Sequence, residues 1–393
     1  MENWSVDTML QHLAEEEHLH GAVVAPIFQN SLFVKDSCEV FLPQEGEDFG
    51  GAGHVYSRIS NPTRDIAESK IAALEGGDRC KLFSSGMGAI SAGIMSATHA
   101  GAHVVCTETA YGPTQKFLRD YMPRFGVSTT FVDGSDTAAV MAACLPNTTL
   151  MVLESPGWFL FNFQDLRALT TFARERSITT MIDNSYSAGV FQQPLSLGVD
   201  IVVHSVTKYL NGHSDVVAGA LVTSHERMEK ILVNEYELFG GALAPFAAWL
   251  VTRGLRTLMV RMRAHEAAGN AVATYLKAHP RISQVFHAAD PDHPHRALFE
   301  SQMTGSSGLL SFAVRDADRA SMVTVVDNLR IFQRGVSWGG FESLAMPLPF
   351  ICESWTEPRW IVRLSLGLEG VDDLIADLDR ALSLPVGTLP SAR

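Results

Sequence analysis

Cysteine is scarce in this 393-residue sequence, and its five cysteines are scattered at positions 38, 80, 106, 144 and 352. No two of them have the short spacing of a metal site or a redox pair, and an odd number fits no closed set of disulfides. We therefore expect a reduced, cytoplasmic protein without a structural metal.

Positive charge is also in short supply, with 30 lysines and arginines against 43 aspartates and glutamates and a formal net charge of −13. Without a basic stripe to displace phosphate counterions, nucleic acid is not an expected partner, and neither is an anionic membrane. No apolar run is long enough to span a bilayer, and the N-terminus lacks the pattern of a signal peptide. A small-molecule ligand is the class that remains.

The length and the 46% hydrophobic content fit a globular chain with one large and one smaller domain. We expect an N-terminal arm over residues 1–50, with a short acidic helix at 8–20. A large ligand-binding domain is expected over 51–245 and a C-terminal small domain over 246–393.

Alternating helical and β-rich segments between about 64 and 225 predict an α/β fold with a mostly parallel sheet. The expected strands are short, at 103–107, 127–132, 150–153, 179–182, 201–203 and 220–222. A helical stretch over 242–279 leads to the small domain, where we expect strands at 309–314 and 361–366 and a helix at 371–384. Ligands of such sheets bind at the carboxyl ends of the strands.

Lys208 lies just past one of these expected strand ends, in the segment His204-Ser-Val-Thr-Lys. A lysine is costly to bury without a partner, and an imine to a cofactor aldehyde is one way to keep it there. Ser205 and Thr207 can offer hydroxyls to a phosphate on the same cofactor. The competing interpretation of Lys208 is a solvated lysine at the start of a helix.

Asp183 directly follows the neighbouring strand expected at 179–182. Pyridoxal 5'-phosphate (PLP) needs a carboxylate at its pyridine nitrogen, because the protonated ring is the better electron acceptor. An aspartate and a lysine at adjacent strand ends can reach opposite sides of one ring. Alone, Asp183 is equally well interpreted as a helix N-cap.

Three further residues fit the same cofactor. In Ser84-Ser-Gly-Met-Gly, the backbone N–H groups of Gly86 and Met87 at a helix start can cradle a phosphate. Glycine-rich turns are common, however, so this signal is weak by itself. Tyr111 can stack on the cofactor ring, although an aromatic before a turn is also an ordinary core residue.

Cations occur at two other informative places. Tyr56 and Arg58, before the first clear helix of the large domain, can both donate to a phosphate dianion. Arg363 stands in an otherwise apolar strand and therefore calls for an anionic partner. A substrate carboxylate and a structural ion pair are the two candidates.

Together these motifs resemble the transsulfuration, or Cys/Met metabolism, family of PLP enzymes. The resemblance covers nearly the whole chain after residue 50 and is carried by Tyr56-Ser-Arg, Leu74-Glu-Gly-Gly, Ser85-Gly-Met, Tyr111-Gly, Leu153-Glu-Ser-Pro, Ile182-Asp-Asn, Ser205-Val-Thr-Lys-Tyr-Leu-Asn-Gly-His-Ser-Asp and Arg253-Gly-Leu-Arg-Thr-Leu. The C-terminal half looks closest to bacterial cystathionine β-lyases, through Thr304-Gly-Ser-Ser-Gly, Ser337-Trp-Gly-Gly-Phe-Glu-Ser and Leu366-Gly-Leu-Glu-Gly.

The resemblance implies the aminotransferase-like type I fold and a homotetramer built from two dimers. It also implies a role for each matching residue. Tyr56 and Arg58 reach the cofactor phosphate of the neighbouring subunit, and the phosphate is bound within the subunit by Gly86, Met87, Ser205 and Thr207. On the cofactor ring, Tyr111 stacks and acts in catalysis, Asp183 pairs with the nitrogen, and Lys208 forms the imine. The substrate is bound by Arg363, Ser337, Trp338 and Tyr56.

The activity that the resemblance implies is cleavage of a carbon–sulfur bond by β-elimination, of the cystathionine β-lyase type, in methionine biosynthesis. Four residues depart from that pattern, namely Val55, Lys116, Trp158 and Val336. At position 336 a valine is typical of methionine γ-lyases. The alternative is therefore γ-elimination from methionine, cystathionine or another γ-substituted amino acid such as canavanine. An alternative of another class is a non-catalytic subunit with the same fold.

Overall fold

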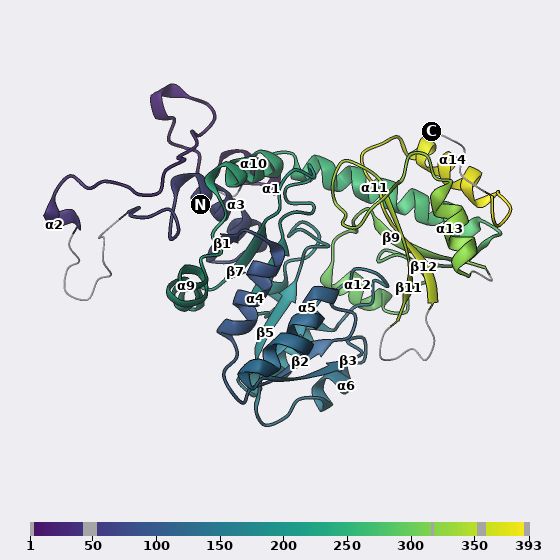
Figure 1. Ribbon diagram of the computed structural model, residues 1–393, viewed down its shortest axis with the longest axis horizontal. Coiled ribbons are helices and arrows are strands. Elements are labelled where there is room, and N and C mark those ends of the chain that lie inside the picture. The colour runs from purple at the N-terminus through teal and green to yellow at the C-terminus, as the bar shows by residue number, and fades with distance from the viewer. Residues whose placement is uncertain (1–3, 42–52, 316–317, 352–358, 389–393) are drawn as a thin grey trace.

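The computed structural model describes residues 4–41, 53–315, 318–351 and 359–388. Figure 1 shows a large sheet in the centre, a smaller sheet at one end and an N-terminal segment that extends from the opposite end. The long helix α11 (Leu258–Ala278) runs from the part around the large sheet to the small sheet. Within the described ranges, none of the helices is both long and apolar enough to cross a membrane.

The N-terminal segment contains three short helical elements, α1 (Val6–His12), η1 (Leu19–Gly21) and α2 (Cys38–Phe41). The helix predicted at 8–20 is too long, because Ala14 has a φ of 62° and leaves the right-handed helical region. Residues 42–50 of the predicted arm lie outside the described residues. Lys70 helps to fix this segment on the body, because its buried amine donates to the carbonyl of Leu10 in α1 and pairs with Glu15 beyond the end of that helix.

The large sheet has seven strands in the order β1-β7-β6-β5-β4-β2-β3. Every pairing except the two that β7 makes with β1 and β6 is parallel, so the predicted mostly parallel sheet is confirmed. The strands are β1 (Arg79–Phe83), β2 (His103–Thr107), β3 (Ser128–Val132), β4 (Thr148–Leu153), β5 (Thr179–Asp183), β6 (Ile201–Ser205) and β7 (Gly219–Thr223). Strand β1 was not predicted.

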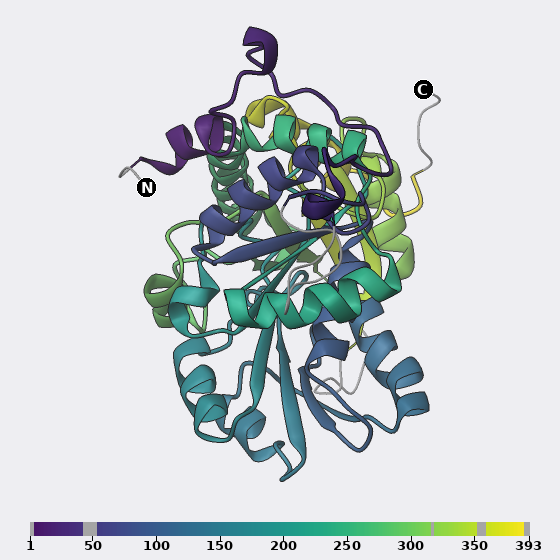
Figure 2. The same ribbon diagram turned by 90° about the vertical axis from the view of Figure 1, so that its left-hand side faces the viewer.

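Helices cover both faces of the large sheet, as Figure 2 shows from the side of the N-terminal segment. Parallel strands that are covered on both faces are apolar throughout, and β2 is buried at every position. The helical elements of this part are α3 (Pro62–Glu75), α4 (Gly86–Ser96), α5 (Gly112–Lys116), η2 (Phe117–Tyr121), η3 (Met122–Phe125), α6 (Thr137–Ala142), α7 (Leu166–Glu175), η4 (Pro194–Leu197), α8 (His225–Ile231), η5 (Leu232–Tyr236), α9 (Glu237–Phe239) and α10 (Pro245–Leu255).

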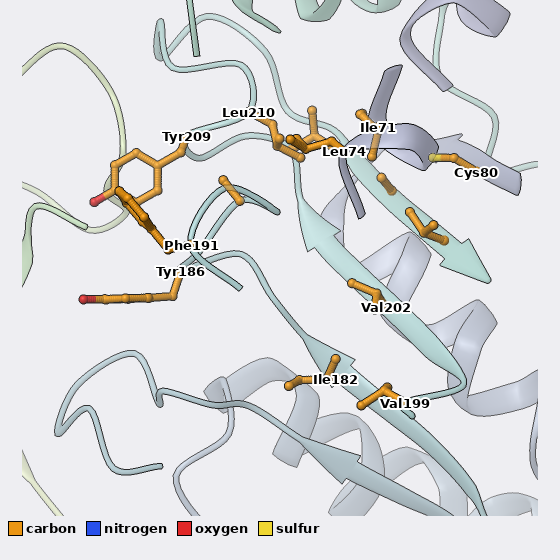
Figure 3. Close-up of a cluster of buried hydrophobic side chains, with 14 of the residues drawn as sticks. Ile71, Leu74, Cys80, Ile182, Tyr186, Phe191, Val199, Val202, Tyr209 and Leu210 are labelled. Atoms are coloured by element: carbon orange, nitrogen blue, oxygen red, sulfur yellow. The ribbon is translucent and has the colours of Figure 1, made fainter. Parts of the chain in front are cut away.

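One buried cluster connects helix α3 to the strands that lead to the predicted site. Ile71 and Leu74 of α3 belong to the same buried cluster as Val202 of β6, Ile182 of β5 and Tyr209, all of which Figure 3 draws. Packing on this face holds the ends of β5 and β6 in place. Those strand ends carry Asp183 and Ser205.

The small sheet has five strands in the order β10-β11-β12-β9-β8. Its elements are β8 (Ile282–Phe286), α12 (Arg296–Gln302), β9 (Leu309–Val314), α13 (Arg319–Asp327), β10 (Gln333–Arg334), β11 (Leu344–Phe350), β12 (Arg359–Ser365) and α14 (Val371–Leu382). The single helical stretch predicted over 242–279 is instead two helices, α10 and α11. At the end of α10 the carbonyl of Gly254 accepts from the backbone N–H of Thr257 and from the guanidinium of Arg261.

Candidate active site

The carboxyl ends of the large-sheet strands and residues of the small sheet enclose a cavity of about 500 Å³. Ten of the twelve site residues predicted from the sequence line it. They are Gly86, Met87, Tyr111, Asp183, Ser205, Thr207, Lys208, Ser337, Trp338 and Arg363. Tyr56 and Arg58 are the two that do not.

Lys208 follows strand β6 and projects into this cavity, where it is partly buried. Its Nζ donates to the hydroxyl of Ser337 over 2.5 Å and lies 5.5 Å from the ring centre of Trp338. Burial, and then the nearby charge of Arg363, lowers the pKa of the Lys208 amine to about 8. A substantial fraction of this amine is therefore neutral near physiological pH.

Asp183 lies at the end of β5 and lines the same cavity. Its Oδ1 accepts hydrogen bonds from the Ser185 backbone N–H (2.9 Å) and hydroxyl (2.5 Å). Burial raises the pKa of the Asp183 carboxyl, and these two hydrogen bonds oppose the rise, as do the charges of His204 and Lys208. The other carboxylate oxygen accepts no hydrogen bond from a described residue and can serve a ligand.

A buried polar network behind the strands supports Asp183 and Ser205. Successive strand residues face opposite sides, so Asn184 and His204 point away from the cavity. One oxygen of Glu75 binds both of them, at 2.7 Å from Asn184 Nδ2 and 2.6 Å from His204 Nε2. Helix α3 thereby ties the ends of β5 and β6 together.

The start of helix α4 forms a backbone cradle. The Ser85 hydroxyl caps the helix by accepting from the Gly88 N–H, which leaves the N–H groups of Gly86 and Met87 without a helical acceptor. A Cβ at Gly86 would lie 3.1 Å from the Ser205 hydroxyl, so a side chain there would fill the space between them. Such a cradle suits a phosphate.

Arg363 of strand β12 is only 3% exposed. Its Nη2 donates to the carbonyl of Ser337 over 2.8 Å, and its Nε is buried without an acceptor. Burial lowers the pKa of this guanidinium to about 10. Among the described residues, no carboxylate lies within ion-pairing distance of it, so the structural ion pair considered above is not found. An anionic ligand is the partner that its environment calls for.

The turn that carries Ser337 is strained and closely packed. Ser337 has a φ of 82°, which is unfavourable for any residue other than glycine. Gly339 also has a positive φ, and a Cβ there would lie 2.8 Å from the backbone nitrogen of Tyr209. The glycine allows the turn to approach the backbone beside Lys208, which brings the Ser337 hydroxyl to the lysine amine.

Glu154, directly after strand β4, is a site residue that was not predicted, although it belongs to the motif Leu153-Glu-Ser-Pro. It lines the cavity and accepts hydrogen bonds from the backbone N–H groups of Tyr111 (2.7 Å) and Trp158 (3.1 Å). Its position after an apolar strand, like that of Asp183, was a usable signal. Met346 also lines the cavity, and nothing in the sequence marked it.

Tyr56 and Arg58 lie away from the cavity of their own chain. Arg58 donates to the carbonyl of Glu237 over 3.2 Å and lies 5.5 Å from the Tyr56 ring centre. Both side chains are exposed, Tyr56 at 43%. Lys116, one of the four residues that depart from the β-lyase pattern, is exposed at the end of α5 and does not line the cavity.

The donor set of the cavity fits PLP. A backbone cradle with the Ser205 hydroxyl can take the phosphate, a carboxylate with an unused oxygen is available to the ring nitrogen, and an amine of lowered pKa is available to the aldehyde. Asp183 and Lys208 line the same cavity, as a shared cofactor requires.

Comparison with known proteins agrees with this fit. The family model for Cys/Met metabolism PLP-dependent enzymes matches residues 7–383, so the chain belongs to that family. The predicted family, fold class and cofactor are therefore confirmed.

Individual relatives extend over nearly the full chain. An L-methionine gamma-lyase of Fusobacterium nucleatum subsp. nucleatum is 37% identical over 97% of this chain and 99% of its own length. A cystathionine gamma-synthase of Mycobacterium bovis is 38% identical over 92% of both chains. The crystal structure of cystathionine gamma-lyase from Lactobacillus plantarum, complexed with L-serine, aligns with a TM-score of 0.87 at 33% identity, over 97% of this chain and 99% of that one.

Proposed function

We propose that this enzyme is a carbon–sulfur lyase that eliminates an uncharged thiol from the γ-carbon of an amino acid such as methionine. The names of the relatives support γ-chemistry better than the β-elimination that the sequence analysis placed first. At the site, Val336 lines the cavity where a valine is typical of methionine γ-lyases.

The main support for this proposal is the set of charged residues that line the cavity. Its charged lining residues are Glu154, Asp183, Lys208 and Arg363. Both oxygens of Glu154 accept backbone N–H groups, and the other three are assigned to the cofactor and the α-carboxylate. Among the described residues of this chain that line the cavity, none is left for the distal ammonium or carboxylate of cystathionine. Since Val336, Met346 and Trp158 supply the remaining wall, an apolar leaving group suits it best.

PLP, when bound, withdraws electrons from the bonds at the substrate α-carbon. We assign its phosphate to the cradle at Gly86 and Met87 with Ser205 and Thr207, and its ring nitrogen to Asp183. Lys208 would hold its aldehyde, and Tyr111 would lie against its ring.

The chain's own groups would then move the protons. Lys208 Nζ, kept partly neutral by burial, accepts the α-proton, and the Ser337 hydroxyl at 2.5 Å orients it. For γ-elimination a second proton must leave the β-carbon. The Lys208 amine accepts this proton too, once it has released the α-proton. Burial, and then the charge of Asp183, raises the pKa of Tyr111, so its phenol stays protonated and can donate to the departing sulfur.

Identification of the keto acid tests the reaction. Incubation of the PLP-loaded enzyme with L-methionine is expected to release 2-oxobutyrate and methanethiol, with a higher kcat/KM than for L-cystathionine. Pyruvate from cystathionine, without 2-oxobutyrate from either substrate, would establish β-elimination instead. One observation favours that second candidate: Trp338, from the segment that resembles β-lyases, lies against the Lys208 amine.

We also propose that Tyr56 and Arg58 complete the cavity of a second copy of the chain, within a homotetramer in the cytoplasm. Their exposure and their distance from their own cavity support this assignment. Mixing Lys208→Ala subunits with Arg58→Ala subunits tests it. Each variant alone is expected to be nearly inactive, while one of the two sites in a mixed dimer would be intact. Absence of any recovered activity would contradict the exchange.

A further inference from the structure

The substrate side of the cavity contains an aromatic contact that the proposed mechanism has not used. The guanidinium carbon of Arg363 lies 5.0 Å from the ring centre of Trp158. Arg363 is 3% exposed and, among the described residues, has only a carbonyl and the sulfur of Met346 as polar contacts. The face of Trp158 is thus a principal compensation for this buried charge before a ligand arrives.

Trp158 is itself held in a fixed position. Its backbone N–H donates to one oxygen of Glu154, whose second oxygen accepts the N–H of Tyr111. The Trp158 and Tyr111 rings meet edge to face, with centres 6.5 Å apart and planes at 86°. Phe159 packs on Trp158 in a similar way at 5.2 Å. One buried carboxylate therefore positions two aromatic walls of the cavity at once.

We propose that Trp158 is a positioning residue for the substrate α-carboxylate, acting through Arg363. Its ring backs one face of the guanidinium and fixes the orientation of the planar fork. It also excludes water from that face. The N–H groups in the plane of the guanidinium can then donate two parallel hydrogen bonds to one carboxylate. This inference rests on the proposed use of Arg363 for the carboxylate. It predicts that Trp158 strengthens binding of amino acids and leaves binding of simple amines unchanged.

Paired ligands isolate that contribution. Glycine carries the α-carboxylate but no leaving group, and methylamine is the same amine without the carboxylate. Both can be titrated against the PLP-loaded enzyme by the absorbance of the bound cofactor. In Trp158→Ala we expect glycine to bind about tenfold or more weakly, and methylamine to stay within about twofold of wild type. Trp158→Phe keeps an aromatic face and should recover most of the glycine affinity.

A matched control is Trp360→Ala. Trp360 lies on strand β12, as Arg363 does, but it does not line the cavity, so this variant removes an indole without altering the site. It should leave the glycine-to-methylamine ratio unchanged. In Trp158→Ala, kcat/KM for the amino-acid substrate should fall mainly through KM. The inference is overturned if Trp158→Ala keeps the wild-type affinity for glycine, or if it loses affinity for glycine and methylamine equally. It is also overturned if Trp158→Phe binds glycine as weakly as Trp158→Ala does. Because neither ligand undergoes elimination, the result is independent of whether the enzyme forms 2-oxobutyrate or pyruvate.

Discussion

The two sides of the cavity differ in the structural elements and in the residue types that form them. The cofactor side consists of the ends of neighbouring strands, where Asp183 and Ser205 are supported from behind by Glu75. The substrate side consists of a strained turn, strands β11 and β12 of the second sheet and the loop that carries Trp158. The first presents fixed polar groups, whereas the second is mainly apolar with one buried cation. A family with one cofactor and many substrates is expected to keep the first and vary the second.

Loss of the cofactor-side amine should have the largest effect. In Lys208→Ala, no amine remains to hold the cofactor covalently or to accept the α-proton, so kcat should fall by about 10⁴-fold. Steady-state keto-acid release measures this, and the cofactor absorbance band near 420 nm should disappear. Lys116→Ala, an exposed lysine outside the cavity, is the control and should be fully active. Undiminished turnover in Lys208→Ala would defeat the catalytic assignment.

Asp183→Asn tests the ring-nitrogen assignment on the same side. The amide has nearly the same shape but no charge, and loss of a buried ionic partner costs about 3 kcal/mol or more. We expect kcat to fall by about 100-fold, with the covalent bond to Lys208 still detectable by absorbance. If instead the variant released its cofactor completely while retaining its melting temperature, Asp183 would serve affinity rather than electron withdrawal.

The sequence could indicate which residues lie on the first side of the cavity because its signals there are local. A polar residue at the carboxyl end of a buried strand, as with Asp183 and Ser205, places that side chain at the sheet edge whatever the rest of the fold does. Glu154 carries the same signal and could have been assigned in the same way. The two groups that donate to it are the backbone N–H groups of Tyr111 and Trp158, however, and their approach depends on the tertiary fold.

The substrate side could not be predicted in the same detail. Strand β11 contains Pro347 and Pro349, which argue against a strand. Strand β10 pairs only with Leu344 and Ala345 of β11, so β11 is an edge strand at the two prolines. A proline is tolerated there because an edge residue needs no N–H donor on its open side. The contact between Trp158 and Arg363 joins residues about 200 positions apart, and no pattern in the sequence indicates it. Ser337 and Trp338, part of the resemblance to β-lyases that favours β-elimination, also lie on this side.

A charge at position 336 would sharpen the contrast between the two sides. Val336 lines the cavity and is 77% exposed, so a carboxylate there stays partly solvated. In Val336→Glu we expect kcat/KM for cystathionine to rise relative to that for methionine by about fivefold, the effect of an exposed ion pair worth about 1 kcal/mol. Val336→Gln, which adds the same bulk without charge, should leave the ratio near its original value. An equal change in both variants would mean that size, not charge, sets the preference.

The smallest expected effect links the two sides through Lys208. In the cofactor-free protein, burial and the charge of Arg363 both disfavour the lysine ammonium, so the neutral amine should become available as the pH rises through about 8 instead of 10.5. Reductive methylation followed by peptide mass spectrometry can follow Lys208 alone. Replacing Arg363 with leucine removes the second of these causes, so the midpoint should move to higher pH while methylation of Lys116 is unchanged. A midpoint that stays in place would mean that burial alone controls the amine, and that the substrate side does not influence the cofactor side electrostatically.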